Sequence, residues 1–207
     1  MADIFTERLR RETYEDHMLL HVNPLMVAVI RGKITENQYV PWNKELYHIH
    51  SSLETLAEHC SPELQYKKCF SKDQVRSNWL KNDLEFLTDS DKIEQSLDVT
   101  LAYHHEVSDI WGNNPDALLG AVYVFEGAAS GGGSLLASKI RERFNFNKNG
   151  ISYLEGHGSE EKNKFNEFKQ RLNDANFSKK TEDEIISCAS ITFHSIDKIY
   201  KEIMLKY

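Results

Sequence analysis

Cysteine is scarce in this chain of 207 residues, and its spacing gives no sign of a metal site. The three cysteines are Cys60, Cys69 and Cys188, and no two of them form a Cys-x-x-Cys pair. An odd number of widely spaced cysteines argues against a disulfide-stapled scaffold and against a cysteine-based zinc site. The pattern is typical of a reducing compartment, so we expect a cytoplasmic protein.

Positive charge and long apolar runs are also in short supply. The 32 acidic residues outnumber the 25 lysines and arginines and give a net charge of −7, whereas a nucleic-acid-binding domain normally shows a basic patch. The longest apolar runs, Pro24–Ile30 and Leu118–Phe125, fall far short of the roughly 20 residues that span a bilayer. The charged N-terminus lacks the apolar segment of a signal peptide. We therefore expect no nucleic-acid partner and no membrane anchor.

Strand signals are missing as well, and helix signals take their place. No segment alternates apolar and polar residues with the period of two that a strand shows. Apolar residues recur at helical spacing instead, and Thr35–Gln38, Ser71–Gln74 and Thr181–Glu184 have the form of a capping box. The pattern predicts an all-α chain with helices near residues 3–30, 36–60, 72–88, 95–111, 115–143, 159–174 and 181–205. Because no linker or internal repeat interrupts it, we expect one domain over residues 1–207.

Glycine is concentrated in one stretch, EGAASGGGSLLASK, from Glu126 to Lys139. This stretch lies inside the helix predicted near 115–143, where each glycine costs about 1 kcal/mol relative to alanine. Gly127 and Gly131 fall on the same face, one turn apart. The missing side chains let either a neighbouring helix or a flat ligand approach the backbone, and the spacing alone leaves both open. The number of glycines exceeds what tight helix packing usually needs, which favours a ligand.

A flat ligand needs anchors, and the first predicted helix supplies a candidate. His17 lies on a stripe with Thr13 and Leu20, so its neutral ring can face an apolar interior and serve as an axial ligand for iron. His21, one turn further on, is the rival ligand. Arg10 lies two turns before His17, where it can pair with an acidic group at the edge of the ligand.

Several blocks of the sequence, taken together, resemble the heme oxygenase family. They are LRRETYEDH, ending at His17; LYHIHSSLE, from Leu46; LKNDLEFL, from Leu80; YVFEGAASGG, from Tyr123; RLN, from Arg171; and ASITF, ending at Phe193. The blocks occur in order and span nearly the whole chain, with small differences in length. A single block would be weak, but several in register are specific.

The resemblance implies a multi-helix bundle that holds heme between its first helix and a glycine-kinked distal helix. It implies oxidative cleavage of heme to biliverdin, carbon monoxide and Fe2+, with heme as both substrate and cofactor. Dioxygen and an external electron donor, such as a ferredoxin or a flavin reductase, are the implied partners. The chain looks like a soluble, bacterial-type member without the membrane tail of the animal enzymes.

The same resemblance implies roles for individual residues. His17 is the implied iron ligand, and Thr13 stands four residues before it as in the family. Arg10 and Arg171 match basic positions that can contact the heme propionates, whereas for Lys164 and Lys169 a solvated surface role is favoured. The distal, catalytic side is implied to be lined by Gly127, Ser130, Gly131 and Gly132.

One position departs from the family pattern and keeps two other functions open. Many members carry an acidic residue after the first distal glycine, where this chain has Ala128, which can neither donate nor accept a proton. A heme carrier of the same fold, without turnover, is therefore one alternative. The other is a non-heme di-iron oxidase. Its ligands would come from Glu45, His48, Glu126 and His194. The segment TFHSIDKIY, however, lacks the closely spaced histidines and aspartate expected of such a site.

Overall fold

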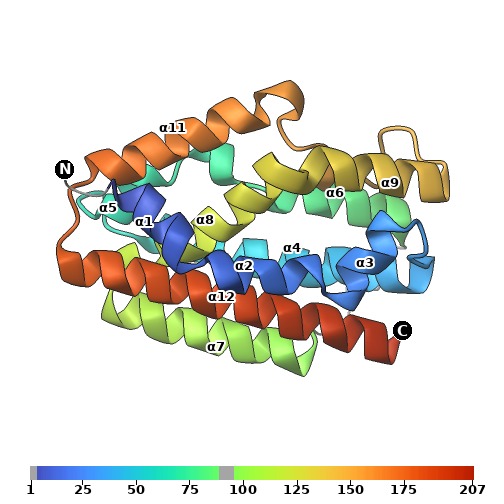
Figure 1. Ribbon diagram of the computed structural model, residues 1–207, viewed down its shortest axis with the longest axis horizontal. Coiled ribbons are helices and arrows are strands. Elements are labelled where there is room, and N and C mark those ends of the chain that lie inside the picture. Colours follow the sequence, from blue (N-terminus) through green and yellow to red (C-terminus); the bar gives the residue numbers. More distant parts are fainter. Residues whose placement is uncertain (1–3, 89–95) are drawn as a thin grey trace.

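The computed structural model describes residues 4–88 and 96–207, and within these ranges the chain is helical and contains no strand. Figure 1 shows an elongated bundle in which α12 (Lys179–Lys206) runs along most of the molecule. It packs against α8 (Leu119–Ala128), α7 (Asp98–Asn113) and α4 (Glu36–His59). The architecture is all-α, as the sequence predicts.

The closest approach in the core is the crossing of α8 and α12. A Cβ atom on Gly120 would lie 2.1 Å from the carbonyl oxygen of Ile185 and 2.7 Å from the backbone nitrogen of Ala189. No side chain fits at that distance, so glycine is required there for packing. The contact brings the two backbones together and fixes α8 as the buried centre of the bundle.

The first predicted helix, 3–30, is wrong as a single element. Within the described residues it consists of α1 (Phe5–Glu12), α2 (Tyr14–His21) and α3 (Pro24–Ile30). The first break lies at Thr13, whose hydroxyl donates to the carbonyl of Leu9 at 2.8 Å. The second lies at Asn23, whose side chain accepts from the N–H of Leu25 at 2.9 Å and caps α3 ahead of Pro24.

The helix predicted near 115–143 is also subdivided, although its path stays helical. It begins with a 3-10 turn, η3 (Pro115–Leu118), and continues through α8 into a π-helical turn, η4 (Ala129–Gly133). The last part is α9 (Ser134–Phe144). The π turn falls on the glycine-rich stretch, where the absent side chains permit the wider backbone spiral.

The remaining predictions hold with small shifts. Within the prediction 72–88, the Ser71 capping box opens only a 3-10 turn, η1 (Lys72–Gln74), and α6 (Ser77–Leu87) follows. The prediction 95–111 corresponds to α7, and its first residue lies outside the described ranges. The later helices are α11 (Glu161–Asp174) and α12, which Ser178 rather than Thr181 caps. Three short elements lie outside the predicted helices: α5 (Gln65–Cys69), α10 (Ser152–Glu155) and η5 (Gly158–Glu160).

Among the helices of the described ranges, none combines the length and the apolar character that crossing a membrane would need.

Candidate functional site

The glycine-rich turn η4 has one open face and one packed face. A Cβ on Gly131 or Gly132 would meet no heavy atom within 4 Å. On the opposite side, a Cβ on Gly133 would lie 2.8 Å from the carbonyl oxygen of Leu154 in α10. Close packing therefore explains Gly133, whereas Gly131 and Gly132 leave space that the chain itself does not fill.

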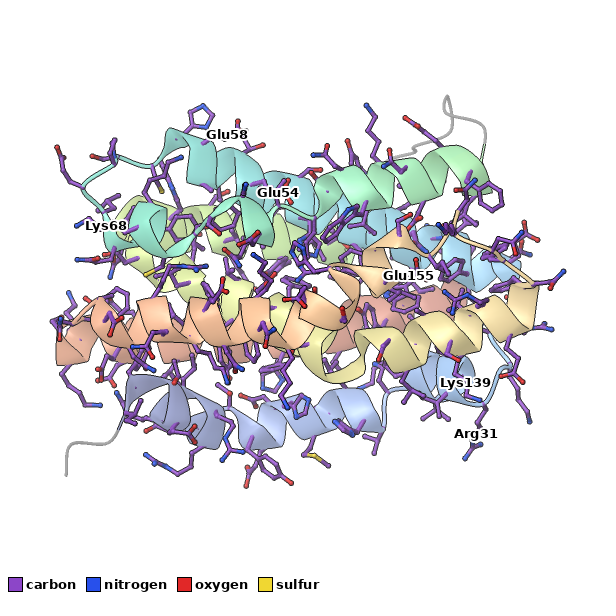
Figure 2. All side chains as sticks on the ribbon, turned by 90° about the horizontal axis from the view of Figure 1, so that it is seen from above. Arg31, Glu54, Glu58, Lys68, Lys139 and Glu155 are labelled. Atoms are coloured by element: carbon purple, nitrogen blue, oxygen red, sulfur yellow. The ribbon has the colours of Figure 1, made fainter. Side chains whose placement is uncertain are left out.

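His17 projects from α2, which lies beside α8 and η4 in two perpendicular views (Figures 1 and 2). The His17 ring is exposed and packs edge-on against Phe193 of α12, with ring centroids 5.8 Å apart. Its Nε2 lies 3.4 Å from Nε2 of His21. Partial burial, and then the charge of His21, lower the pKa of His17, which favours the neutral ring. A neutral imidazole is the form that ligates a metal.

Side chains on α2 fix the rotation of this helix. Thr13, just before α2, is buried and points back to Leu9 rather than outward. Asp16 accepts a hydrogen bond from the hydroxyl of Ser190 at 2.6 Å and lies 3.0 Å from Nε2 of His194. Both partners belong to α12, so these contacts hold the neighbouring His17 on the side of α2 that faces the bundle.

An aromatic pair lies at one edge of the glycine stretch. Phe165 of α11 lies 3.5 Å from the Cβ position of Gly127, and its ring centroid is 5.6 Å from that of Tyr123. Lys169 Nζ lies 4.8 Å from the Phe165 ring centroid. Burial raises the pKa of Tyr123, and the positive charge of Arg10 opposes this rise. Arg10 itself is exposed and lies 3.4 Å from Glu7, so Lys169 is a cation that contacts the aromatic pair beside Gly127.

Arg171 points to another part of the molecule. Its Nε donates to the carbonyl of Cys69 at 2.8 Å and its Nη2 to the side-chain oxygen of Gln74 at 3.0 Å. Lys164 likewise pairs with Asp73 at 3.3 Å. Both side chains tie α11 to the α5–η1 segment. The sequence interpretation favoured Arg171 over Lys169 as a ligand contact; in the structure Arg171 is bound to Cys69 and Gln74, whereas Lys169 lies beside Phe165.

The distal side offers few polar groups. Ala128 is exposed, and Ser130 is half-buried within η4. The nearest carboxylate in the sequence is that of Glu126, but this side chain is buried and pairs with Arg76. The structure therefore supplies no acidic side chain of α8 or η4 to the open glycine face.

Three of the four ligand candidates of the di-iron hypothesis have other partners. Glu45 accepts from the backbone N–H of Leu97, Glu126 pairs with Arg76, and His194 pairs with Asp16. Within residues 4–88 and 96–207, no group of three or more histidines, cysteines and acidic residues is arranged to hold a metal ion.

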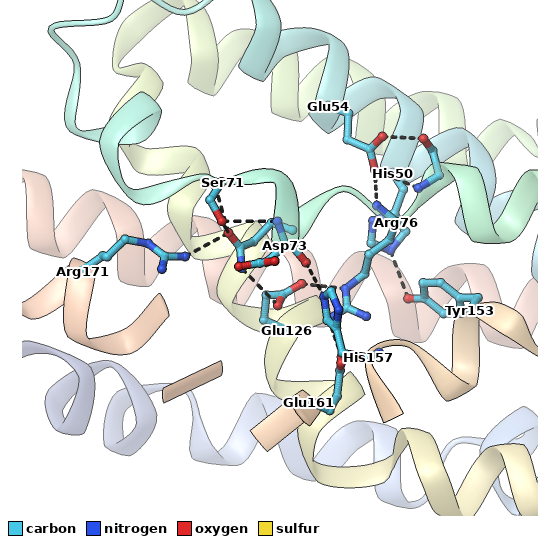
Figure 3. Close-up of polar contacts among 12 residues, drawn as sticks. His50, Glu54, Ser71, Asp73, Arg76, Glu126, Tyr153, His157, Glu161 and Arg171 are labelled. Atoms are coloured by element: carbon cyan, nitrogen blue, oxygen red, sulfur yellow. Dashed lines mark hydrogen bonds and ion pairs between the residues drawn. The ribbon is translucent and has the colours of Figure 1, made fainter. Parts of the chain in front are cut away.

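The sequence interpretation missed a buried ion cluster centred on Arg76 (Figure 3). Arg76 and Glu126 are 1% and 2% exposed, and Arg76 Nε lies 2.6 Å from a Glu126 oxygen. Arg76 Nη2 lies 2.5 Å from an oxygen of Glu161. Burial opposes the charge of Arg76, but the hydrogen bond and charge of Glu126, together with the charge of Glu161, outweigh it and raise its pKa. The signal was Glu126 itself, because a charge that follows the apolar run LLGAVYVF needs a buried partner.

A model of the heme oxygenase family matches residues 3–202 of this chain. Among solved structures, heme oxygenase-1 from the cyanobacterium Synechocystis, in complex with heme, superposes with a TM-score of 0.91 at 20% identity. The match covers 99% of this chain and 94% of that chain. Heme oxygenase from Leptospira interrogans superposes with a TM-score of 0.89 at 21% identity, covering 97% of this chain and 100% of that chain.

A third structure shows that the fold extends to a protein without an assigned activity. A domain of unknown function with a heme oxygenase-like fold, from Shewanella denitrificans, superposes with a TM-score of 0.79 at 15% identity. The match covers 100% of this chain and 94% of that chain. No curated protein matches the chain at a significant level.

Proposed function

The chain belongs to the heme oxygenase family, and we propose that it cleaves heme to biliverdin, carbon monoxide and Fe2+ with dioxygen and external electrons. One observation carries the proposal. A neutral histidine, His17, projects from a helix that lies beside a helical turn whose Gly131 and Gly132 meet nothing within 4 Å.

The residues present fit heme. A porphyrin is flat, its iron takes a neutral imidazole as an axial ligand, and its two propionates pair with cations. His17 would hold the iron, and the bare backbone at Gly131 and Gly132 would lie over the ring. Lys169, which lies over the Phe165 ring beside Gly127, and the exposed Arg10 would hold the propionates.

Other residues of the site orient these groups. Thr13 ends α1 through its bond to Leu9 and so sets the direction in which α2 leaves. Asp16 keeps His17 facing the bundle through α12. Ser130 lies at the edge of the distal face. Arg171 has a structural role, because its guanidinium is bound to Cys69 and Gln74.

Heme, when bound, supplies both the iron at which dioxygen is reduced and the ring that is cleaved. The chain supplies position, polarity and access. Because Ala128 is apolar and Glu126 is held by Arg76, protons reach the distal side through backbone groups and ordered water. Electrons come from a separate donor, such as a ferredoxin or a flavin reductase, in the cytoplasm.

Heme reconstitution tests this proposal. The purified protein is mixed with ferric heme, and its Soret band is followed after addition of ascorbate, with catalase present to remove free peroxide. We expect the Soret band to form and then decay as the absorption of biliverdin appears. A protein that takes up no heme would contradict the proposal entirely.

A heme carrier is the second candidate, and Ala128 is the observation that favours it. A carrier needs the axial ligand and the flat cradle, but it needs no proton supply on the distal side. In the same experiment, a Soret band that persists under ascorbate would identify a carrier and exclude the enzyme.

A further inference from the structure

The open face of η4 raises the question of what holds this backbone in place. Gly131 and Gly132 carry no side chains and touch nothing on their open side within 4 Å. A π-helical turn is uncommon and occurs mostly as a single turn inside an α-helix. The turn therefore depends on contacts at its two ends.

The end nearer α8 is held by an ion pair. Glu126 directly precedes Gly127 and is the only charged residue in α8. One carboxylate oxygen accepts from Arg76 Nε at 2.6 Å, and the other lies 3.5 Å from the side-chain nitrogen of Gln74. Arg171 in turn donates to the side-chain oxygen of Gln74, which turns the amide nitrogen of Gln74 towards Glu126.

The same guanidinium holds the chain on the other side of the turn. Arg76 Nη2 donates to Glu161, the first residue of α11, at 2.5 Å. The second oxygen of Glu161 accepts from the backbone N–H of His157 at 2.9 Å. Arg76 thus joins the helix before the glycines to the segment that follows α10, and α10 supplies the carbonyl of Leu154 that packs on Gly133.

Arg76 itself is fixed from α4. A single oxygen of Glu54 accepts from the backbone N–H groups of Arg76 and Ser77, at 2.8 and 2.9 Å. Three buried or nearly buried charges are a costly way to stabilise a core, because apolar residues of similar volume often serve stability equally well. Their directional contacts favour a role in geometry.

We propose that Arg76 is a positioning residue for the distal backbone: by holding Glu126 and Glu161 together, it fixes the η4 turn and with it the open backbone face of Gly131 and Gly132. The effect on a bound heme rests on the proposed function. The effect on η4 is independent of it, and the two are tested separately.

The first test uses hydrogen exchange on the heme-free protein, because it needs no ligand. Glu126→Gln leaves a neutral acceptor for Arg76 and so preserves the fold. We expect the backbone amides of residues 127–133 to exchange at least tenfold faster in this variant, with little change elsewhere. Arg76→Lys keeps the charge but cannot bind both carboxylates in the same geometry, so it should give the same local pattern.

Glu45→Gln is the matched control. Glu45 is a 4%-exposed carboxylate on α4 that accepts from the backbone N–H of Leu97 at the start of α7. Its loss should accelerate exchange at the start of α7 and leave 127–133 unchanged. If 127–133 keep their wild-type rates in Glu126→Gln, or exchange faster only in step with the whole chain, the positioning role is refuted.

The second test uses the heme-loaded protein. The stretching frequency of carbon monoxide on ferrous heme reports the distal side, and the iron–histidine stretch reports His17. Glu126→Gln should shift or broaden the carbon monoxide band and leave the iron–histidine band unchanged. Glu45→Gln should change neither band. An unchanged carbon monoxide band would overturn the link to the site. A wild type without heme uptake would refute the proposed function alone, since hydrogen exchange still decides the role of Arg76.

Discussion

The two helices on either side of the proposed site are attached to the bundle in opposite ways. In α2 no residue is buried, whereas in α8 the whole run Leu119–Glu126 is buried. The first carries the proposed iron ligand, and the second continues into the glycine turn. The comparison shows that the site joins a lightly attached helix to a firmly embedded one. A helix such as α2, which buries no residue in the protein alone, would gain apolar contacts from the proposed ligand.

The largest expected effect comes from removing the anchor on the lightly attached side. His17→Ala should take up heme with an altered ferric spectrum and lose turnover, because the proposed axial ligand is removed. Added imidazole should restore much of the wild-type spectrum. The measurement is absorption spectroscopy with a biliverdin assay. His21→Ala is the companion variant, and if it shows these losses while His17→Ala does not, the ligand assignment is wrong.

A substitution at the crossing of α8 and α12 should instead lower the stability of the fold. Gly120→Ala puts a methyl group 2.1 Å from the carbonyl oxygen of Ile185, and neither backbone can yield easily. We expect a loss of about 3 kcal/mol in the free energy of unfolding, measured by urea denaturation. Gly112→Ala in α7, where a Cβ meets nothing within 4 Å, should instead be neutral or slightly stabilising. Equal stabilities for the two variants would refute the close crossing of α8 and α12.

Replacing a glycine on the open face should weaken heme binding without lowering the stability of the fold. Gly131→Leu places its side chain in empty space, so the fold should survive while the dissociation constant for heme rises at least tenfold. Heme titration and thermal denaturation measure the two properties. Gly112→Leu, also in a helix with open space, should bind heme as the wild type does. Normal heme affinity in Gly131→Leu would show that the open face is not a ligand surface.

A smaller effect is expected from loosening α2 further. Asp16→Asn removes the charge that faces Ser190 and His194, at a partly buried position. We expect a loss of about 1 kcal/mol or less in the free energy of unfolding, with heme affinity reduced a few-fold. Glu15→Gln, an exposed neighbour on the same helix, should have no such effect. Identical heme affinities for the two variants would contradict the role given to Asp16.

The smallest expected change in stability at neutral pH comes from replacing His50, which lies on the embedded side. Burial, and then the charge of Arg76, lower the pKa of His50 to about 3, and Glu54 and Glu126 line the same small cavity. An unfolded histidine has a pKa near 6.5, so the unfolded chain binds more protons between about pH 6.5 and pH 3. His50 therefore lowers stability as the pH falls through this window.

His50→Gln can keep the hydrogen bond to Tyr153 but cannot take up a proton. Its free energy of unfolding should fall less steeply than that of the wild type below pH 6.5. The difference is under about 1 kcal/mol at pH 6 and grows towards pH 3. Parallel pH profiles from denaturation experiments would show that His50 is not held neutral by burial.

Local patterns in the sequence predicted the long helices well, because apolar periodicity belongs to each helix by itself. The break at Thr13 was missed, since it depends on one hydroxyl that turns back to Leu9. Asn23–Pro24 has the form of a helix start, but it was overlooked because the apolar pattern continues through it. Resemblance to a family supplied the site roles of His17 and the distal glycines, and these roles stay predictions.

Contacts between segments far apart in the sequence could not be predicted from local patterns. Arg76 meets Glu126 across 50 positions of the chain and Glu161 across 85, and no periodicity connects them. The glycines give the same lesson, because sequence alone could not tell Gly120, which touches the backbone of α12, from Gly131, which touches nothing. Only the packed structure assigns one to the core and the other to an open surface.

The division of residues 5–30 into α1, α2 and α3 bears on how a ligand held against α2 would leave. Each piece has eight residues or fewer, well below the length at which a helix is stable alone in water. Their order therefore depends on docking against the rest of the bundle. We expect α2, which lies between the breaks at Thr13 and Asn23, to open at a small fraction of the free energy of global unfolding. Release of such a ligand would then require only this local opening, while α8 and α12 stay together.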